Sequence, residues 1–409
     1  MFFVESVKKI CYNYFVYKKQ KGGICTNNES KSLFDLIKSA LTGQKATVNS
    51  NINWDKIIKI AKLHQITPII FYGLKNSGLK TPYDDILFEI TGQHIIIEQQ
   101  QLGIIEEIET AFTKNNIDFA FLKGSRLKYI YPKSEMRIMG DIDVLINPAQ
   151  YTQIREVLLE LNFTEKFQWD YECHWQKNGI NIEVHKHFNS NNGEKLYAFF
   201  GDIWQKLKAE KQNKNSFVMS KEDEYIYIFA HLTRHYRTGG IGLRQFIDLY
   251  AFNLKYPQLD MTYVESALKQ LGYFEFYQNV IKTLDCWFNG AKMDDTIKTI
   301  TLYTIKSGLF GTSENNDMAL ISDSVKKSGS AKKAKVKAFL SAVFPSVAMV
   351  NKRFRILKKA PWLLPAVWVI RWISVIFKPQ KIKNNTKRLK NFSAETVAEF
   401  DSKLKKVGL

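Results

Sequence analysis

The chain has 409 residues, of which 59 are Lys or Arg and 40 are Asp or Glu, so its formal net charge is +19. This length is more than one ordinary domain needs and excludes a small protein held by disulfides, while 45% hydrophobic residues exclude a disordered or collagen-like chain. The charge is uneven, because residues 1–325 carry 38 basic and 37 acidic side chains, whereas residues 326–409 carry 21 basic and three acidic ones.

The cysteines and the N-terminus indicate a compartment. The four cysteines form no CxxC pair and have no regular spacing, which argues against a cysteine zinc site and against a disulfide framework. The first residues include Glu5 and lack a small-residue cleavage site, so they are not typical of a signal peptide. We therefore expect a cytoplasmic protein, with a peripheral place on the inner membrane through its basic tail.

Residues 1–115 are predicted to form an N-terminal helical region. The apolar residues from Trp54 to Ala61 follow the i, i+3, i+4, i+7 spacing of a buried helical stripe. Thr81, followed by proline and two aspartates, predicts the start of a long helix, which Asn115 ends.

Residues 116–210 have the pattern of an α/β core. Ile117–Leu122 is β-prone, Gly124 and Ser125 form a turn, and Asp141–Ile146 predicts a second strand. Two or three further strands are expected over Phe163–Gln176 and Ile180–Phe188.

The rest of the chain divides into three predicted parts. Residues 211–312 form a helical domain, with Ser220 and Asp223 in the positions of a capping box. Residues 313–337 are polar and then basic, which is typical of a linker, and residues 338–409 form a basic, Trp-rich C-terminal segment.

Two carboxylates on one strand are the first indication of chemistry. Because side chains alternate along a strand, Asp141 and Asp143 project together while Ile142, Val144 and Ile146 form the opposite, apolar face. Neighbouring carboxylates repel each other, and a divalent metal ion commonly stabilises such a pair. Downstream, Glu183 is also on a predicted strand and shares its face with His185 and His187.

These features occur in an order that identifies a resemblance. A Gly-Ser turn, an Asp-x-Asp strand and a later acidic strand residue are typical of polymerase-β-like nucleotidyltransferases, and the chain resembles that superfamily. It is more closely similar to a broad bacterial family of nucleotidyltransferases, over roughly residues 50–255. The segments that carry this similarity are AKLHQITPIIFYGL, FLKGSRLKYIYP, RIMGDIDVLI, NIEVHKHF and HLTRHYRTGGIGLRQFIDLYAF. The resemblance implies an α+β fold, in which a small mixed sheet is flanked by N-terminal and C-terminal helical regions.

The resemblance also implies a mechanism. Asp141, Asp143 and Glu183 would be catalytic and would hold two Mg²⁺ ions, for in-line transfer of a nucleoside monophosphate from a nucleoside triphosphate (NTP). Gly124 would let the backbone approach phosphate and Ser125 would offer an N–H and a hydroxyl. Three cations, those of Lys123, Arg126 and Arg137, are the candidates to neutralise the triphosphate or the leaving pyrophosphate.

Several polar side chains are candidates for a substrate wall. His231, Arg234 and His235 share one helical face, which can line the α/β core or be a solvated or packed face. His185 and His187 are expected beside Glu183 in a substrate-facing or structural role.

Two further patterns have simple interpretations. A zinc site using His185 and His187 with upstream Cys173 and His174 is a less favoured alternative. The i, i+4 pair Arg244 and Asp248 is most simply a surface or inter-helix ion pair.

The C-terminal segment contains the strongest apolar run. APWLLPAVWVIRWISVIF has 18 residues, is interrupted by two prolines and Arg371, and falls short of a membrane-spanning helix. It suits an interfacial helix on anionic lipid, or equally a core helix docked on the body. Binding of nucleic acid is less favoured, because the tail's aromatic residues are not interleaved with its lysines.

The leading hypothesis is a cytoplasmic, Mg²⁺-dependent nucleotidyltransferase whose acceptor is a hydroxyl on a small molecule, a glycan precursor or a protein. The alternative is a catalytically inactive nucleotide-binding or scaffold protein at the inner membrane surface.

Overall fold

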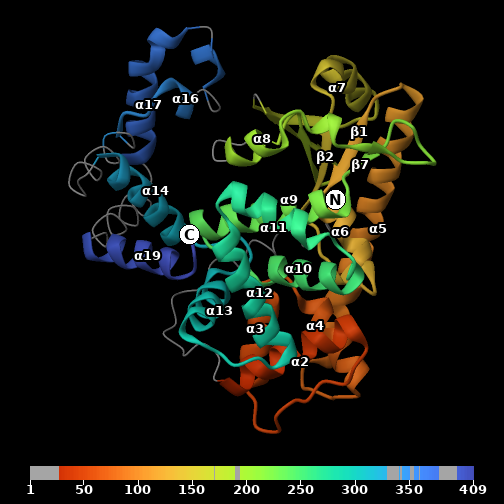
Figure 1. Cartoon of the computed structure of the whole chain (residues 1–409). Coiled ribbons are helices and arrows are strands. Elements are labelled where there is room, and N and C mark those ends of the chain that lie inside the picture. The colour runs from red at the N-terminus through yellow and green to blue at the C-terminus, as the bar shows by residue number, and fades with distance from the viewer. Residues whose placement is uncertain are drawn as a thin grey trace.

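The computed structural model describes residues 27–169, 171–188, 194–328, 340, 343–350, 354–358, 360–376 and 394–409. Much of the predicted basic tail, including residues 329–339 and 377–393, lies outside the described residues. Figure 1 shows the sheet between the long helix α5 on one side and a group of helices around α9 and α10 on the other.

The predicted N-terminal helices are present from residue 27 onward, and residues 1–26 of the predicted region lie outside the described residues. Asn53 caps α3 by accepting a hydrogen bond from the Lys56 N–H, and the α3 stripe Ile57, Ile58 and Ala61 is buried. The long predicted helix is α5, which Asn115 ends as expected. These helices are α2 (Asn27–Thr42), α3 (Trp54–Leu63), α4 (Thr67–Ser77) and α5 (Asp84–Lys114).

A five-stranded mixed sheet forms the α/β core, in the order β1-β2-β5-β4-β3. β2 and β5 run parallel, and the other neighbouring pairs are antiparallel. The small mixed sheet of the predicted α+β fold is therefore confirmed. Its strands are β1 (Phe119–Leu122), β2 (Asp141–Ile146), β3 (Thr164–Gln168), β4 (Glu172–Lys177) and β5 (Ile180–His185).

One face of this sheet is apolar and is covered by α5 and α7 (Tyr151–Glu160). Ile142, Val144 and Ile146 of β2 are fully buried there, as the strand periodicity predicts. This core holds the sheet rigidly while the opposite face carries the polar side chains. Its other members include Ile104, Ile108, Phe112, Ile154, Leu158, Trp175, Ile182 and Val184.

The second, larger core lies on the polar side of the sheet and joins the N-terminal helices to the helical domain. The Ser220 hydroxyl caps α9 by accepting from the Asp223 N–H, so this predicted helix start is confirmed. The helical domain consists of α9 (Lys221–Thr238), α10 (Leu243–Lys255), α11 (Met261–Leu271), α12 (Phe274–Asn289) and α13 (Asp295–Ser307).

Short elements connect these layers. They are α6 (Gly124–Leu127), the 3₁₀ turns η1 (Lys128–Ile130), η2 (Ser134–Met136), η3 (Pro148–Gln150) and η4 (Ile203–Gln205), helix α8 (Glu194–Phe200), and the small strands β6 (Lys208–Ala209) and β7 (Phe217–Val218).

Part of the predicted linker is a helix instead. Helix α14 (Ser313–Ser328) begins beside Thr312, whose hydroxyl accepts from the Asn315 N–H. Ile321 of α14 is buried against Val397 of α19 (Ala394–Lys406). The stretch is polar overall, so its narrow apolar stripe did not indicate a buried helix. The helix that covers this stripe, α19, comes from the far end of the chain.

The described tail elements between α14 and α19 form a small unit at one end of the molecule, beyond α14 in Figure 1. Among its described residues, Val350, Leu357 and Val367 form a small buried apolar cluster. Among the described residues, no helix has both the length and the apolar character needed to cross a membrane. The elements of this unit are α16 (Val347–Val350), η5 (Arg355–Lys358), η6 (Pro361–Leu363) and α17 (Leu364–Ile376).

A buried histidine ties three helices together. The Leu243 N–H, at the start of α10, donates to His64 Nδ1 at 3.1 Å, so the ring proton must be on Nε2, which donates to the Ile305 carbonyl at 3.2 Å. His64 is fully buried, and burial lowers its pKa from 6.5 to about 4. The neutral imidazole is thus part of the native structure.

Acid should weaken the protein through His64. Between pH 6.5 and 4 the unfolded chain binds a proton that folded His64 does not, so stability falls as pH falls, by about 3 kcal/mol for this group. In urea unfolding, His64→Asn should have a lower free energy of unfolding than wild type at pH 7. This difference between the two proteins should be smaller at pH 4, by up to about 3 kcal/mol. A gap that is the same at both pH values would contradict this assignment.

Candidate active site

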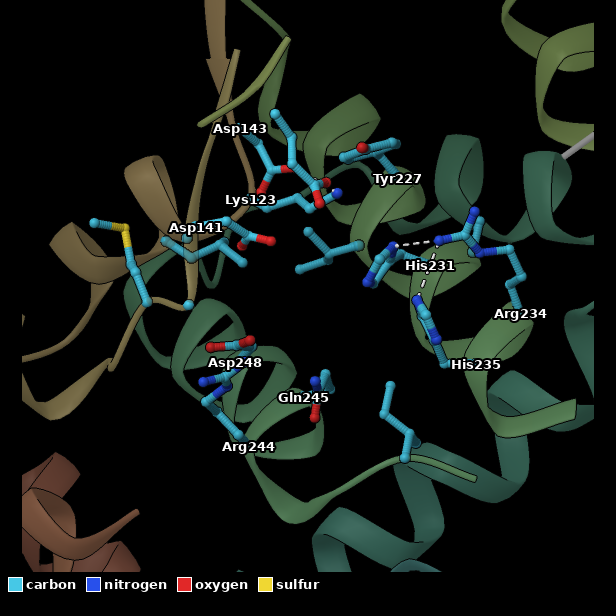
Figure 2. Close-up of a pocket in the computed structure, with 18 of the residues that line it drawn as sticks. Lys123, Asp141, Asp143, Tyr227, His231, Arg234, His235, Arg244, Gln245 and Asp248 are labelled. Carbon is cyan, nitrogen blue, oxygen red and sulfur yellow. Dashed lines mark hydrogen bonds and ion pairs between the residues drawn. The ribbon is translucent and has the colours of Figure 1, made fainter. Parts of the chain in front are cut away.

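A cavity of about 400 Å³ lies between the polar face of the sheet and the helices α9 and α10. Figure 2 shows Asp141 and Asp143 on the sheet side, and His231, Arg234 and His235 of α9 across the pocket. Arg244, Gln245 and Asp248 of α10 form a third wall. Of the sequence-predicted site residues, the cavity is lined by Lys123, Gly124, Arg137, Asp141, Asp143, Glu183, His185, His187, His231, Arg234 and His235.

Strand register brings the polar residues of the sheet together. In the parallel pair, Asp143 of β2 lies beside Glu183 of β5. In the antiparallel pair, His174 of β4 is opposite Glu183, and Glu172 is opposite His185. Because side chains alternate along each strand, all five project from the same face of the sheet, toward the cavity side.

Asp143 is the most constrained of the carboxylates. Lys123 Nζ lies 2.6 Å from its Oδ1, and His185 Nε2 lies 2.8 Å from the same oxygen. Burial alone would raise the pKa of Asp143, but Lys123 and His185 overcome that effect and lower it to about 2. Burial likewise opposes the charge of Lys123, yet Asp143 raises the pKa of Lys123 above its ordinary value. The two groups form a charged pair at neutral pH.

Asp141 and Glu183 carry the opposite shift. Burial, followed by the charge of neighbouring carboxylates, raises the pKa of both. Two carboxyl groups that resist ionisation beside a third, charged one form a site that a divalent cation would stabilise. Ligand atoms of Asp143, Glu183 and His185 also lie within 4.8 Å of one another. The residues present therefore fit a bound metal ion.

The backbone at Lys123 is strained. Its φ of 46° and ψ of −121° lie in a region that residues other than glycine rarely adopt, at a cost of roughly 1–3 kcal/mol. The strain occurs where β1 ends and α6 begins, next to Leu122, which pairs with Asp143. This conformation accompanies the placement of the Lys123 ammonium on the Asp143 carboxylate.

Not all of the predicted phosphate-binding residues face the cavity. Gly124 does, and a Cβ there would lie 2.9 Å from Met139 Cγ. Ser125 is buried, and its hydroxyl has no hydrogen-bond partner within the described part of the chain. Arg126 is not in the lining and lies 3.6 Å from Glu210 instead. Successive positions in a helical turn are about 100° apart around the axis. Position 126 therefore faces about 200° away from position 124, which lines the cavity.

Arg137 is paired in a way that the sequence did not predict. Its Nε and Nη2 donate to the two oxygens of Asp248 at 2.7 and 3.0 Å, and the Tyr131 hydroxyl donates to Asp248 at 2.6 Å. The predicted ion pair between Arg244 and Asp248 is wrong, because Arg244 donates to Ile138 O and Gln65 Oε1. The i, i+4 spacing indicated only a local partner, whereas Asp248 is matched by a distant arginine.

The α9 wall has a defined protonation. Arg234 Nη2 lies 3.5 Å from His231 Nδ1 and 3.1 Å from His235 Nε2. An arginine only donates, so both of these ring nitrogens must accept. Burial, and then His235 beside it, lowers the pKa of His231, while burial and Arg234 lower that of His235 to about 3. Both imidazoles are therefore neutral at pH 7.

Comparison with known proteins gives one family match. The model of a family described as "uncharacterised nucleotidyltransferase" matches residues 50–289, which is more than half of the chain. The chain belongs to this nucleotidyltransferase family. Among curated proteins, none matches the chain.

One solved structure is similar to part of the nucleotidyltransferase. The solution structure of the antibiotic-resistance factor ANT(2'')-Ia is 12% identical, covers 41% of this chain and 89% of that one, and has a TM-score of 0.31. A likeness this weak adds nothing to the assignment, which depends on the family match and on the cavity.

Sequence reasoning missed Glu172, which lines the cavity, although a signal was present. Asn178 and Gly179, both with positive φ, form the two-residue turn between β4 and β5. An Asn-Gly turn pairs the residues on either side of it, and counting back along both strands pairs His174 with Glu183 and Glu172 with His185. Tyr227 and Gln245 also line the cavity, and no local pattern marks them.

The alternative zinc site is excluded for Cys173. This side chain is on the opposite, apolar face of the sheet, where its thiol donates to the Tyr151 hydroxyl. Cys173 and His174 are neighbours in sequence and so project to opposite faces of β4.

Removing the Asp248 carboxylate should destabilise the nucleotidyltransferase. Asp248→Asn leaves Arg137 buried without its anion beside Arg244, whose pKa burial and Arg137 already lower to about 9. Breaking a buried ion pair in this way costs about 3–5 kcal/mol in the free energy of unfolding, measured by urea denaturation. The control Glu156→Gln, exposed on α7, should change it by less than about 0.5 kcal/mol. Equal stability of the two variants would contradict the structural role of Asp248.

Proposed function

We propose that the chain is a metal-dependent nucleotidyltransferase that moves a nucleoside monophosphate from an NTP to a hydroxyl of a small molecule, a glycan precursor or a protein. The observation that carries the proposal is the meeting of Asp141, Asp143 and Glu183 at one buried cavity in a chain of a nucleotidyltransferase family. Such an arrangement of carboxylates is what in-line phosphoryl chemistry with divalent cations needs.

Asp141, Asp143 and Glu183 are the residues that would hold the metal, for which two Mg²⁺ ions are expected. When bound, the ions would neutralise charge on the phosphates and orient the reacting oxygens. In the reaction, the bond between the α-phosphorus and pyrophosphate breaks, a bond to the acceptor oxygen forms, and the acceptor's proton passes to a carboxylate at the cavity. The protein supplies the position of these groups in a partly buried, low-dielectric site.

The remaining cavity residues fit binding roles. Gly124 lines the cavity beside the strand end, and the Lys123 ammonium is already at the carboxylates, where it can balance phosphate charge. The neutral imidazoles of His231 and His235, held by Arg234, form a wall that can hydrogen-bond a nucleotide or an acceptor without adding charge. Arg137 has a structural role in this proposal, because Asp248 neutralises its charge.

Loss of a carboxylate should abolish transfer without unfolding the protein. Asp143→Asn and Asp141→Asn remove charge that balances the metal, which is worth several kcal/mol in the transition state, so the rate should fall by about 100-fold or more. The measurement is transfer of label from α-³²P-labelled NTPs to acceptors in a lysate, with circular dichroism to verify folding. Glu165→Gln, on the edge strand β3 of the same sheet and outside the cavity lining, should keep full activity. Full transfer by either aspartate variant would defeat the proposal.

We also propose that the tail binds anionic membrane surfaces. Residues 326–409 carry 21 basic and three acidic side chains, and the described part of the tail exposes large apolar groups. Trp362 is 74% exposed, Ile370 53% and Ile373 50%. Amphipathic apolar area together with basic charge favours the surface of an anionic bilayer over an aqueous position.

The test is co-sedimentation of the full-length chain with vesicles. Wild type should bind vesicles that contain phosphatidylserine, and should bind pure phosphatidylcholine poorly. Trp362→Ser should weaken binding by about 10-fold or more, because burying one large aromatic side chain contributes about 1.5–3 kcal/mol. Phe88→Ser, an equally exposed aromatic on α5, is the matched control and should bind as wild type does. Equal binding by both variants, or binding to RNA in preference to vesicles, would overturn the membrane assignment.

A further inference from the structure

A histidine lies among the carboxylates at which a metal ion is expected. Ligand atoms of Asp143, Glu183 and His185 are all within 4.8 Å of one another, and Asp143 and His185 are buried. His185 Nε2 is 2.8 Å from Asp143 Oδ1 and 3.8 Å from Glu183 Oε2. Two atoms bound to one ion at about 2.1 Å lie about 3.0–3.5 Å apart. The observed distances lie on either side of that range, so only small movements separate this arrangement from a coordination shell.

The other nitrogen of His185 has the partner that metal-bound histidines usually have. His185 Nδ1 is 3.5 Å from Glu172 Oε2, and Glu172 Oε1 is in turn 3.2 Å from His174 Nε2. A histidine ligand almost always directs its second ring nitrogen to a carboxylate or carbonyl, which sets its orientation and tautomer. Here the sheet register makes this contact, because Glu172 is opposite His185 across β4 and β5.

The need to neutralise Asp143 does not by itself explain why His185 lies beside this carboxylate. Lys123 already lies at 2.6 Å from the same oxygen of Asp143 and supplies a full positive charge. His185 therefore adds to this group an imidazole nitrogen ligand whose other ring nitrogen faces a carboxylate, which is a different chemical property. By contrast, His187 lines the cavity, but it is outside the group of ligand atoms and its ring is next to Tyr197.

We propose that His185 Nε2 is a metal ligand together with Asp143 and Glu183, so that this nucleotidyltransferase takes a divalent first-row transition cation in preference to Mg²⁺. Imidazole suits transition metals, whereas Mg²⁺ is bound almost entirely by oxygen. The inference rests on the proposed function, because it concerns the ion that the proposed reaction would use, and it revises the expectation of Mg²⁺ alone.

The probe is Mn²⁺, whose unpaired electrons report a directly bound nitrogen in pulsed electron paramagnetic resonance. The full-length wild-type protein loaded with Mn²⁺ should show coupling to one ¹⁴N nucleus. The coupling should disappear in His185→Ala and in His185→Asn, and should remain in the matched controls His187→Ala and His174→Ala. Thermal unfolding of the metal-free variants verifies that each is folded, and the asparagine variant keeps a polar side chain in case alanine is not tolerated.

Affinity provides a second readout that does not depend on activity. In isothermal titration, wild type should bind Mn²⁺ at least about 10-fold more tightly than Mg²⁺. His185→Ala should weaken Mn²⁺ binding by about 10-fold or more while changing Mg²⁺ binding by less than about threefold. Glu172→Gln, which removes the outer carboxylate, should weaken Mn²⁺ binding by about 10–100-fold.

The outcomes separate this inference from the proposed function. Mn²⁺ bound by oxygen alone in a protein that transfers nucleotides would overturn the histidine ligand and leave the function intact. A nitrogen coupling that survives in His185→Ala but is lost in His174→Ala would also overturn it. Nitrogen coupling as expected in a protein without transferase activity would support the metal site and defeat the proposed function.

Discussion

The parallel pairing of β2 with β5 is the constraint on which the rest of the site depends. It places Asp143 directly beside Glu183, with Asp141 on the same face, so three carboxylates share one buried wall. Like charges at this separation repel, and burial increases the cost. Burial raises the pKa values of Asp141 and Glu183, and the charge of the neighbouring carboxylates raises them further. The surrounding structure must therefore provide positive charge, from side chains or from an ion.

Side chains provide this positive charge at two places. Lys123 contacts Asp143 directly, from a strained backbone position at the end of β1. Farther from the sheet, Arg137 is matched to Asp248 of α10 in a buried, bidentate pair. The first pair keeps the site charged, and the second fixes the loop before β2 to the helical domain. The cavity thus has walls from two parts of the fold that are tied together.

The net charge of the molecule is divided unevenly between the body and the tail. The body is nearly neutral, and at its cavity Lys123 is paired with Asp143 and Arg137 with Asp248. The excess positive charge belongs to residues 326–409, whose described part has a small core and an exposed apolar surface. Because the excess charge belongs to the tail and the body is nearly neutral, the net charge of the chain is no evidence about the substrate of the cavity.

Much of the fold and part of the site could be predicted from local patterns. The period of two along β2 and β5 separates apolar from acidic residues, and this alone put Asp141 with Asp143 and predicted their buried apolar backing. Capping residues predicted the ends of α5 and α9 for the same reason, since a cap satisfies backbone groups within a few residues. The Asn-Gly turn also specified the pairing of Glu172 with His185, although the signal was overlooked.

What the sequence by itself determined is therefore confined to features set by neighbours within one strand, one helix or one turn. Only the tertiary structure decided which distant groups meet: Arg137 with Asp248, α14 with α19, and Arg126 with Glu210 away from the cavity. These contacts are chosen by the packing of the two cores on either side of the sheet. Charge complementarity acts through space, so spacing along the chain cannot show which of several arginines or carboxylates will be the partner.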